Sequence, residues 1–237
     1  MAANRDEFYA RPTIPATFWP EDPRILGGRD KQAGGTWMAI HQDGRIAGVT
    51  NYRDLANINP DARSRGELPI NYLKGEVGAD TYLETLNKEA KEYNGFNILL
   101  FEQGSMFHYS NYEGKINKIS SGIHGLSNAL LDTEWPKVER LKQSFSKVIE
   151  TTFSHNDLLD ILTNTELADD NDLPNTGVPH DLEKMLSAIC IQSETYGTCS
   201  SSVLTISKDG DVVFTERTYP VGDRKEGTVS FKFRHVG

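Results

Sequence analysis

Four short segments of the chain place polar side chains where an apolar stretch ends: residues 4–7, 48–52, 125–129 and 196–199. The first reads Asn-Arg-Asp-Glu and supplies four hydrogen-bonding side chains in a row. Strand ends at a sheet edge commonly present functional groups, so these segments are candidates for binding or catalysis. Asn and Asp also favour turns, which leaves a purely structural role open for each segment taken alone.

The rest of the sequence gives little indication of a catalytic nucleophile or a metal site. The six histidines are scattered, and none makes the His-x-Glu or His-Glu-x-x-His spacing of a metal site. The serine run 200–202 lacks a nucleophile-elbow pattern. Cys190 lies in an apolar run and is predicted to be a buried small hydrophobe. Cys199, before that serine run, is either reactive or an ordinary strand-end residue.

The charge balance narrows the class of partner. The chain has 34 acidic and 25 basic residues, a net charge of -9, and no basic cluster rises above this background. Nucleic acid and anionic membranes are therefore poor partners, and the oligomeric state stays open. No apolar run approaches the roughly 20 residues of a transmembrane segment, and the first residues lack a secretory signal. Two cysteines without a disulfide framework suit a reducing compartment, so we predict a soluble cytoplasmic protein.

Three hairpins are predicted to position these segments. The stretches 36–42 and 45–51 flank Asp43-Gly44, a pair that suits a type I′ turn because both central residues need positive φ. The same device recurs at Asp209-Gly210, and a looser version at Glu113-Gly114. Three hairpins indicate antiparallel rather than parallel sheet.

Helices are predicted between the strands. Apolar residues recur at helical spacing over 79–93, 135–152 and 155–167, and Pro136 suits a helix start. The alternation of strands and helices, without an internal repeat or a linker, predicts one α+β domain over residues 1–237.

Two stretches are predicted to be loops. Four prolines exclude a long helix from 9–35, which we interpret as an irregular surface loop anchored by Phe18 and Trp19. The acidic, Asn-rich tract 168–179 has no hydrophobic period and is predicted to be a flexible loop.

Taken together, the segments resemble the NRDE family, also called transport and Golgi organisation protein 2-like. The signature is Asn4-Arg5-Asp6-Glu7-Phe8-Tyr9 followed by Arg11-Pro12. Further blocks follow in the family's order over nearly the whole chain: Gly34-Gly35-Thr36-Trp37, Thr50-Asn51-Tyr52, Arg65-Gly66-Glu67-Leu68, Asn94-Gly95-Phe96-Asn97, Gly125-Leu126-Ser127-Asn128-Ala129-Leu130, Tyr196-Gly197-Thr198 and Phe214-Thr215-Glu216-Arg217.

The resemblance implies a fold similar to the N-terminal nucleophile hydrolases, an α+β four-layer αββα sandwich with two antiparallel sheets between helix layers. In such enzymes the first residue after the initiator Met, often Cys, attacks an acyl carbon while its own α-amine moves the proton. A nearby carboxylate or amide holds this amine, and Asn side chains and backbone N–H groups stabilise the oxyanion.

On this resemblance, Asp6 corresponds to the carboxylate that orients the terminal amine, while Asn51 and Asn128 correspond to the amides that stabilise the oxyanion and grip the substrate. The three are expected to converge on one cleft beside the start of the chain. Ligand contacts are expected from the same segments or next to them: Asn4, Arg5, Glu7, Ser127, Cys199 and His124. The structural alternatives are turn formation by the two Asn residues and a structural ion pair of Arg5 and Glu7.

Two departures from the family pattern matter. Family members usually begin Met-Cys and have a complete apolar strand before the NRDE segment, whereas this chain begins Met1-Ala2-Ala3. Alanine has no nucleophilic atom, so this form is expected to lack N-terminal-cysteine chemistry; a start upstream of Met1 would explain the difference. The family also often has Arg where this chain has Cys199, which removes a guanidinium that anchors substrate.

The resemblance implies intracellular haem binding and trafficking, which is the leading expectation. Haem is expected as a transported ligand, and no resident cofactor is predicted. His124 is the first candidate for an axial ligand of the haem iron. The alternative is a hydrolase or acyltransferase that acts on a small acylated amide and needs the N-terminal Cys. A weaker third hypothesis is an interaction module that binds a partner through the acidic loop 168–172.

Overall fold

The computed structural model of the protein describes residues 1–222 and 224–235, which form two antiparallel sheets and five α-helices. The chain divides into two compact units. Unit 1 comprises Met1–Arg11, Ile123–Gly125 and Asp132–Arg234. Unit 2 comprises Pro12–Gly122, Leu126–Leu131 and, at the C-terminal end of the described chain, His235. The prediction of antiparallel sheet is confirmed; the single domain and the four-layer sandwich remain predictions.

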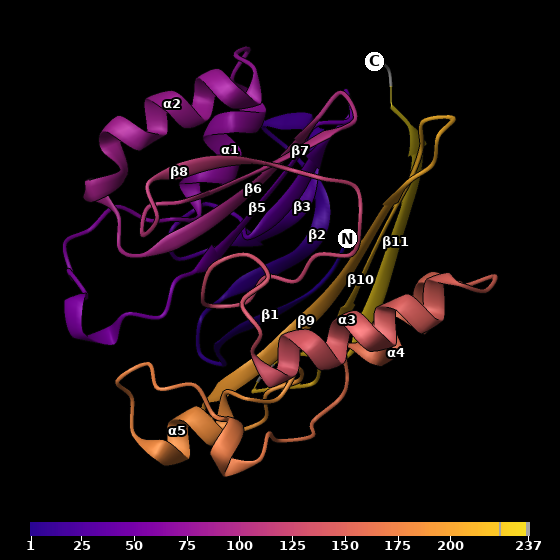
Figure 1. Ribbon diagram of the computed structural model, residues 1–237. Coiled ribbons are helices and arrows are strands. Elements are labelled where there is room, and N and C mark those ends of the chain that lie inside the picture. Colours follow the sequence, from indigo (N-terminus) through magenta and orange to yellow (C-terminus); the bar gives the residue numbers. More distant parts are fainter. Residues whose placement is uncertain (223, 236–237) are drawn as a thin grey trace. The chain divides into compact units, whose positions relative to one another are not determined.

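Unit 1 is a four-stranded sheet with helices along it (Figure 1). The strands lie in the order β1 (Ala2–Phe8), β9 (Tyr196–Ile206), β10 (Asp211–Thr218) and β11 (Gly227–Arg234). The helices are α3 (Pro136–Ile149), α4 (His155–Ile161) and α5 (His180–Met185), with a 3-10 turn η3 (Asp170–Asp172) between the last two. Leu158, Leu159 and Val203 form a core between α4 and the sheet.

Local sequence signals explain where the helices of unit 1 begin and end. Pro136 occupies the first turn of α3 as predicted, where its missing N–H costs nothing. Ser154 and Asp157 form a capping box at the start of α4. This helix is shorter than the predicted 155–167, because the chain turns after it and the Leu162 carbonyl accepts a hydrogen bond from the Asn4 side chain at 2.9 Å. The acidic tract after it is irregular apart from η3.

Unit 2 is a seven-stranded sheet in which each strand lies beside the next in sequence. Its strands are β2 (Thr13–Trp19), β3 (Asp22–Asp30), β4 (Met38–His41), β5 (Ile46–Asn51), β6 (Phe96–Glu102), β7 (Ser105–Ser110) and β8 (Lys115–Ile119). Its helices are α1 (Glu67–Lys74) and α2 (Ala79–Glu89), with 3-10 turns η1 (Leu55–Asn57) and η2 (Ala90–Glu92). Both helices lie over the sheet (Figure 1), and their apolar residues share one core with Trp19, Phe96 and Tyr109.

The loop predicted over 9–35 is wrong, because β2 and β3 occupy most of it. Pro15 is tolerated in β2 because β2 is an edge strand and its register with β3 shifts between Ile14 and Thr17, so Pro15 is in no regular ladder pair. Trp19 is a buried anchor as predicted, whereas Phe18 is only partly buried. The prolines exclude helix but not strand.

The three predicted hairpins are confirmed, but the predicted turn type is wrong. Gly44 and Gly210 have φ of 93° and 86°, whereas Asp43 and Asp209 do not have positive φ. The Gly44 N–H donates to the His41 carbonyl, and the His41 N–H donates to the Arg45 carbonyl. This is a three-residue loop in which only the glycine is left-handed, so Asp-Gly does not distinguish it from a type I′ turn.

Candidate functional site

A six-residue segment, Leu126–Leu131, is hydrogen-bonded to the sheet of unit 2; we call it the strap. The hydroxyl of Thr50 donates to the Ser127 carbonyl at 3.0 Å. The Arg53 N–H donates to the Asn128 carbonyl at 2.8 Å. These bonds hold the strap at the end of β5.

The strap places two of its predicted site residues, Ser127 and Asn128, beside a third, Asn51. The Asn128 side-chain amide donates to the Asn51 carbonyl at 3.0 Å, and Ser127 precedes Asn128 in the chain. Among the residues that the structure describes, the exposed Asn51 side chain has no hydrogen-bond partner. One backbone-anchored amide and one solvent-facing amide therefore lie next to each other, an arrangement able to hold a carbonyl or carboxylate oxygen.

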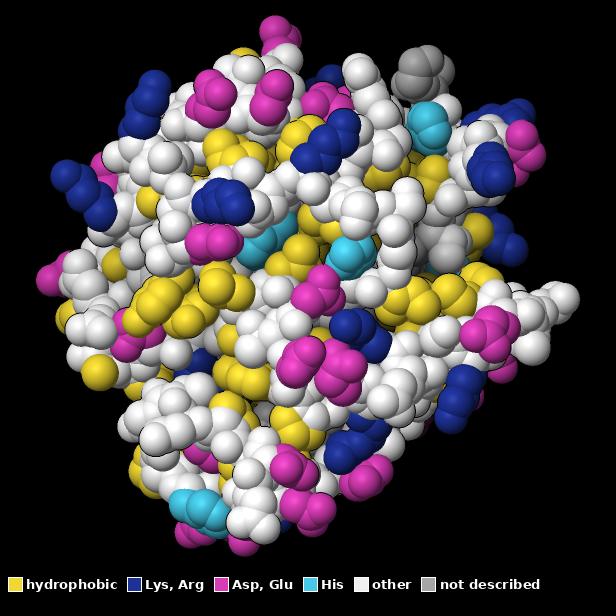
Figure 2. All heavy atoms as spheres, viewed as in Figure 1, with side chains coloured by type: hydrophobic (Ala, Val, Ile, Leu, Met, Phe, Trp, Pro, Cys, Tyr) yellow, Lys and Arg dark blue, Asp and Glu magenta, His cyan; other side chains and the backbone are white. Residues whose placement is uncertain are grey.

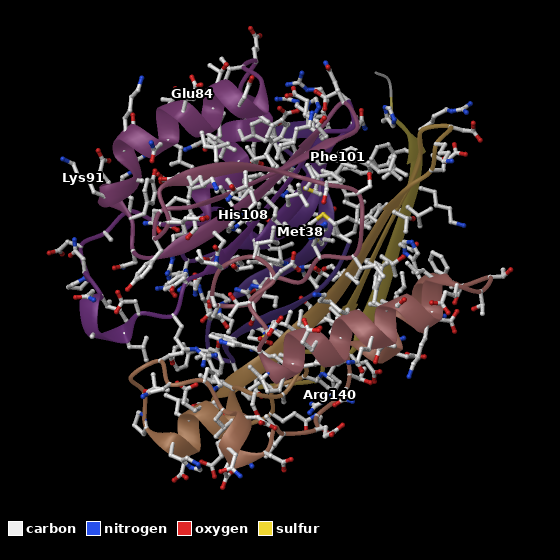
Figure 3. All side chains as sticks on the ribbon, viewed as in Figure 1. Met38, Glu84, Lys91, Phe101, His108 and Arg140 are labelled. Atoms are coloured by element: carbon white, nitrogen blue, oxygen red, sulfur yellow. The ribbon has the colours of Figure 1, made fainter. Side chains whose placement is uncertain are left out.

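Two buried residues beneath the strap were not predicted as site residues. The Asn97 side chain donates to the Ala129 carbonyl at 2.9 Å, and its oxygen lies 3.1 Å from His108 Nε2. Figure 3 labels His108, which comes from β7. The sequence pointed to Asn97 only as part of the family block 94–97. Nothing in the sequence indicated a functional role for His108 beyond its place in a predicted strand.

In unit 1, the predicted residues of β1 divide between the two faces of the sheet. Asn4 and Asp6 face the same side: Asn4 donates to the Leu162 and Ile189 carbonyls, and Asp6 accepts from the Thr198 hydroxyl at 2.7 Å. Side chains alternate along a strand, so Arg5 and Glu7 face the other side. They form an ion pair, which was the structural alternative, with 3.8 Å between the Arg5 guanidinium and the Glu7 carboxylate.

A β-bulge lets two hydroxyl groups of β9 face Asn4 and Asp6. Asp6 lies opposite Thr198 and Arg5 opposite Ser200, so Cys199 is the extra residue. Thr198 can then reach Asp6 while Ser201 donates to the Asn4 side chain. The Cys199 thiol is buried against the Glu7 carbonyl at 3.5 Å, an environment that suits a structural thiol rather than a ligand contact.

Asp6 is half-buried in the sheet. Burial raises its pKa above the usual range, against the opposing effects of the Lys137 charge, the Thr198 hydroxyl and the Arg5 charge. A half-buried carboxyl group with nearby cations is typical of functional sites as well as of structural ion networks.

The amine of Met1 lies at the other end of β1 from Asp6. It donates to the Leu204 carbonyl at 2.6 Å, and burial lowers its pKa to about 6. Asp6 and Ala2 are four residues apart in an extended strand, which separates them by roughly 13 Å. The Met1 amine and the Asp6 carboxyl group are therefore apart, and a role of Asp6 in orienting a terminal amine remains a prediction.

A cavity of about 460 Å³ opens in unit 1 beside Thr198, whose hydroxyl donates a hydrogen bond to Asp6. Its wall includes Thr198 together with Tyr9, Cys190, Gln192 and Tyr219. Cys190 is buried as predicted, and burial raises the pKa of its thiol.

His124, the predicted axial ligand, is held by a carboxylate. Its Nδ1 lies 2.6 Å from Asp132 Oδ2, and the Gly125 N–H donates to the other oxygen of Asp132 at 2.8 Å. The Lys142 ammonium lies 3.6 Å from the same carboxylate. Burial raises the pKa of Asp132, but the bonds from Gly125 and His124 and the charge of Lys142 hold it below the usual range overall. Asp132 is therefore ionised and accepts the Nδ1 proton.

The predicted residues thus fall into two groups. Asp6, Asn4, Arg5, Glu7, Cys199 and His124 lie in unit 1, and Asn51, Ser127 and Asn128 in unit 2. Convergence of Asp6 with the two amides remains a prediction. Residues 1–222 and 224–235 contain no cluster of three His, Cys, Asp or Glu able to hold a metal ion. No helix within these ranges is long and apolar enough to cross a membrane. Figure 2 shows acidic and basic side chains interspersed on the face drawn.

Comparison with known proteins accounts for the order of these motifs. A family model described as Transport and Golgi organisation 2 matches residues 1–220. The chain is 35% identical over 240 residues to the Transport and Golgi organization 2 homolog of Mus musculus and to the Transport and Golgi organization protein 2 homolog of Homo sapiens, with 92% of this chain and 85% of each relative covered. It is 29% identical over 244 residues to Transport and Golgi organization protein 2 of Drosophila melanogaster, with the same shares covered. The resemblance drawn from the NRDE signature is confirmed, and the chain belongs to the Transport and Golgi organisation 2 family.

Proposed function

We propose that the protein binds haem reversibly and passes it on, with His124 as an axial ligand. The observation that carries the proposal is the 2.6 Å contact between His124 Nδ1 and the Asp132 carboxylate. Histidines that bind metals commonly donate their other ring N–H to a carboxylate, which sets the tautomer and raises the basicity of the ligating nitrogen. With the Nδ1 proton held by Asp132, a neutral imidazole carries its lone pair on Nε2, the nitrogen through which we propose that His124 binds iron.

Further features support haem as cargo rather than as a fixed cofactor. His124 is partly exposed, with 27% of its side chain accessible, so a ligand can reach it from solvent. The sequence has no Cys-x-x-Cys-His motif that would attach haem covalently. The proposal also places the protein in the cytoplasm, in line with two cysteines that are both free and buried.

Haem titration tests the proposal. Purified protein titrated with micromolar haem should give a saturable Soret shift, and His124→Ala should weaken binding at least tenfold. His180→Ala is the matched control, because His180 is also beside acidic residues but is 60% exposed on α5 and not predicted as a ligand. No spectral change in the wild type overturns the proposal, whereas equal affinity in the wild type and His124→Ala rejects His124 alone.

The alternative is a hydrolase or acyltransferase acting on an acylated amide, on a four-layer αββα scaffold. It is favoured by the adjacent Asn51 and Asn128 amides and by the half-buried Asp6, whose hydroxyl partner Thr198 lines a cavity. This chemistry needs a Cys at the N-terminus of the protein. Reading the codons upstream of Met1 tests it: an in-frame Met-Cys followed by a short apolar strand supports the enzyme, and a stop codon directly before Met1 rejects it.

A further inference from the structure

A row of three polar side chains crosses β5, β6 and β7 in unit 2. Thr50 comes from β5, Asn97 from β6 and His108 from β7. Asn97 is 0% and His108 is 1% exposed. Because a buried polar group is costly unless it is hydrogen-bonded, the contacts of this row define its protonation and its orientation.

The direction of each hydrogen bond follows from the acceptors. The Asn97 side chain has one nitrogen and one oxygen, and the Ala129 carbonyl, 2.9 Å away, can only accept. Its nitrogen therefore faces Ala129, and it also donates to the Thr50 hydroxyl at 3.3 Å. The Thr50 hydroxyl in turn donates to the Ser127 carbonyl.

This orientation leaves the Asn97 oxygen facing His108. The oxygen lies 3.1 Å from Nε2, and an amide oxygen can only accept, so Nε2 carries a proton. We infer that His108 is the positioning residue of the strap: its Nε2 proton holds the Asn97 amide, and Asn97 holds Ala129 so that Asn128 stays beside Asn51.

The inference deepens the alternative function, since it concerns the two amides expected to grip a substrate. Its test uses no ligand, so its failure and the failure of that function are distinguishable. If the strap is held as inferred but no amide substrate is turned over, only the enzyme hypothesis is lost.

The tautomer is the first test. Long-range ¹⁵N–¹H correlation spectra of the full chain should show His108 with a protonated Nε2. A neutral ring with its proton on Nδ1 overturns the inference, because Nε2 could not then donate to Asn97.

Hydrogen exchange is the second test, because two adjacent amides report on different contacts. The Arg53 amide is bonded to Asn128 in the strap, while the Tyr52 amide is bonded to Gly95 next to the sheet. In His108→Leu, we expect protection of Arg53 to fall about tenfold relative to Tyr52, the usual effect of losing one buried hydrogen bond. In His108→Gln, whose amide places an N–H near the position of Nε2, protection should return to within about twofold of the wild type.

Ser110→Ala is the matched control. Ser110 lies two residues along β7 on the same face, and its hydroxyl donates to the Phe96 carbonyl at 3.0 Å rather than to the strap. This variant should leave the ratio of Arg53 to Tyr52 protection unchanged. An unchanged ratio in His108→Leu, or an equal loss in Leu and Gln variants, overturns the positioning role.

Discussion

The side-chain amide of Asn128 donates to the backbone carbonyl of Asn51 at 3.0 Å, across 77 positions of sequence. This bond places two amides side by side at the end of β5. It uses one donor of Asn128 and none of the Asn51 side chain, so both residues retain hydrogen-bonding capacity toward a ligand.

Asn97→Ala should destabilise the protein by about 2 kcal/mol, because it leaves the Ala129 carbonyl and His108 Nε2 buried without their partner. Urea unfolding measures the change. Asn117→Ala is the control: its hydrogen bond to Glu113 is exposed, and it should cost less than about 0.5 kcal/mol. Equal losses in the two variants would contradict a buried network.

Gly197→Ala should cost about 2 kcal/mol, since a Cβ there would lie 2.4 Å from the Ile191 carbonyl oxygen and 2.5 Å from the Tyr9 hydroxyl. The backbone oxygen is fixed by its hydrogen bond from Thr198, so it cannot move away freely. Gly227→Ala, with no atom within 4 Å of the added Cβ, should change the free energy of unfolding by less than about 0.5 kcal/mol. Thermal or urea unfolding that ranks the two variants equally would contradict this reasoning.

His155 should make unit 1 less stable in mild acid. Its two ring nitrogens each lie 2.9 Å from a hydroxyl group, those of Thr205 and Thr215. Burial lowers the pKa of His155 below its usual 6.5, and the charges of the chain terminus and Lys232 add to this. The unfolded state therefore binds the proton first, so the stabilisation is present above pH 6.5 and is lost as pH falls through the folded pKa.

The measurement is the free energy of unfolding between pH 8 and pH 5. Wild-type protein should lose more stability over this range than His155→Gln, which keeps hydrogen-bonding capacity but does not titrate. Parallel pH profiles for the two proteins would show that His155 is not the cause.

Asp6 should have the opposite dependence. Its folded pKa is raised above the unfolded value of 3.8, so its contribution to stability is present below pH 3.8 and is lost as pH rises through the folded pKa. Asp6→Asn removes this titration. The variant should therefore gain stability relative to the wild type as pH rises from 4 to 8.

Asp157→Asn serves as a control of opposite sign for Asp6. Backbone and side-chain hydrogen bonds from Ser154 lower the pKa of Asp157, so its contribution is present above the unfolded pKa and is lost as pH falls through the folded value. Relative to the wild type, this variant should lose stability as pH rises from 2 to 5. If Asp6→Asn follows the same direction, the Asp6 carboxylate is stabilised rather than opposed by its surroundings.

Local physical chemistry was enough to predict much of the fold. The hairpin around Asp43-Gly44 could be predicted because the turn pair and its flanking strands lie within a few positions of one another. Helix α3 could be predicted because its apolar spacing and Pro136 act within single turns. The same local logic failed over 9–35, since proline excludes helix but cannot say that β2 lies at a sheet edge. Family membership could also be predicted from the sequence, because the order of the motifs along the chain does not depend on the tertiary structure.

Only the tertiary structure decided the roles of the polar residues. Asp6 and Asn4 face Thr198 and Ser201 because of a bulge at Cys199, which no periodicity predicts. His108 looked like any strand histidine until the strap was seen docked above Asn97. Hydrogen-bond direction and burial depend on which distant segments of the chain come into contact. The sequence therefore determines the type of each side chain, whereas its protonation and its hydrogen-bond partners depend on the tertiary structure.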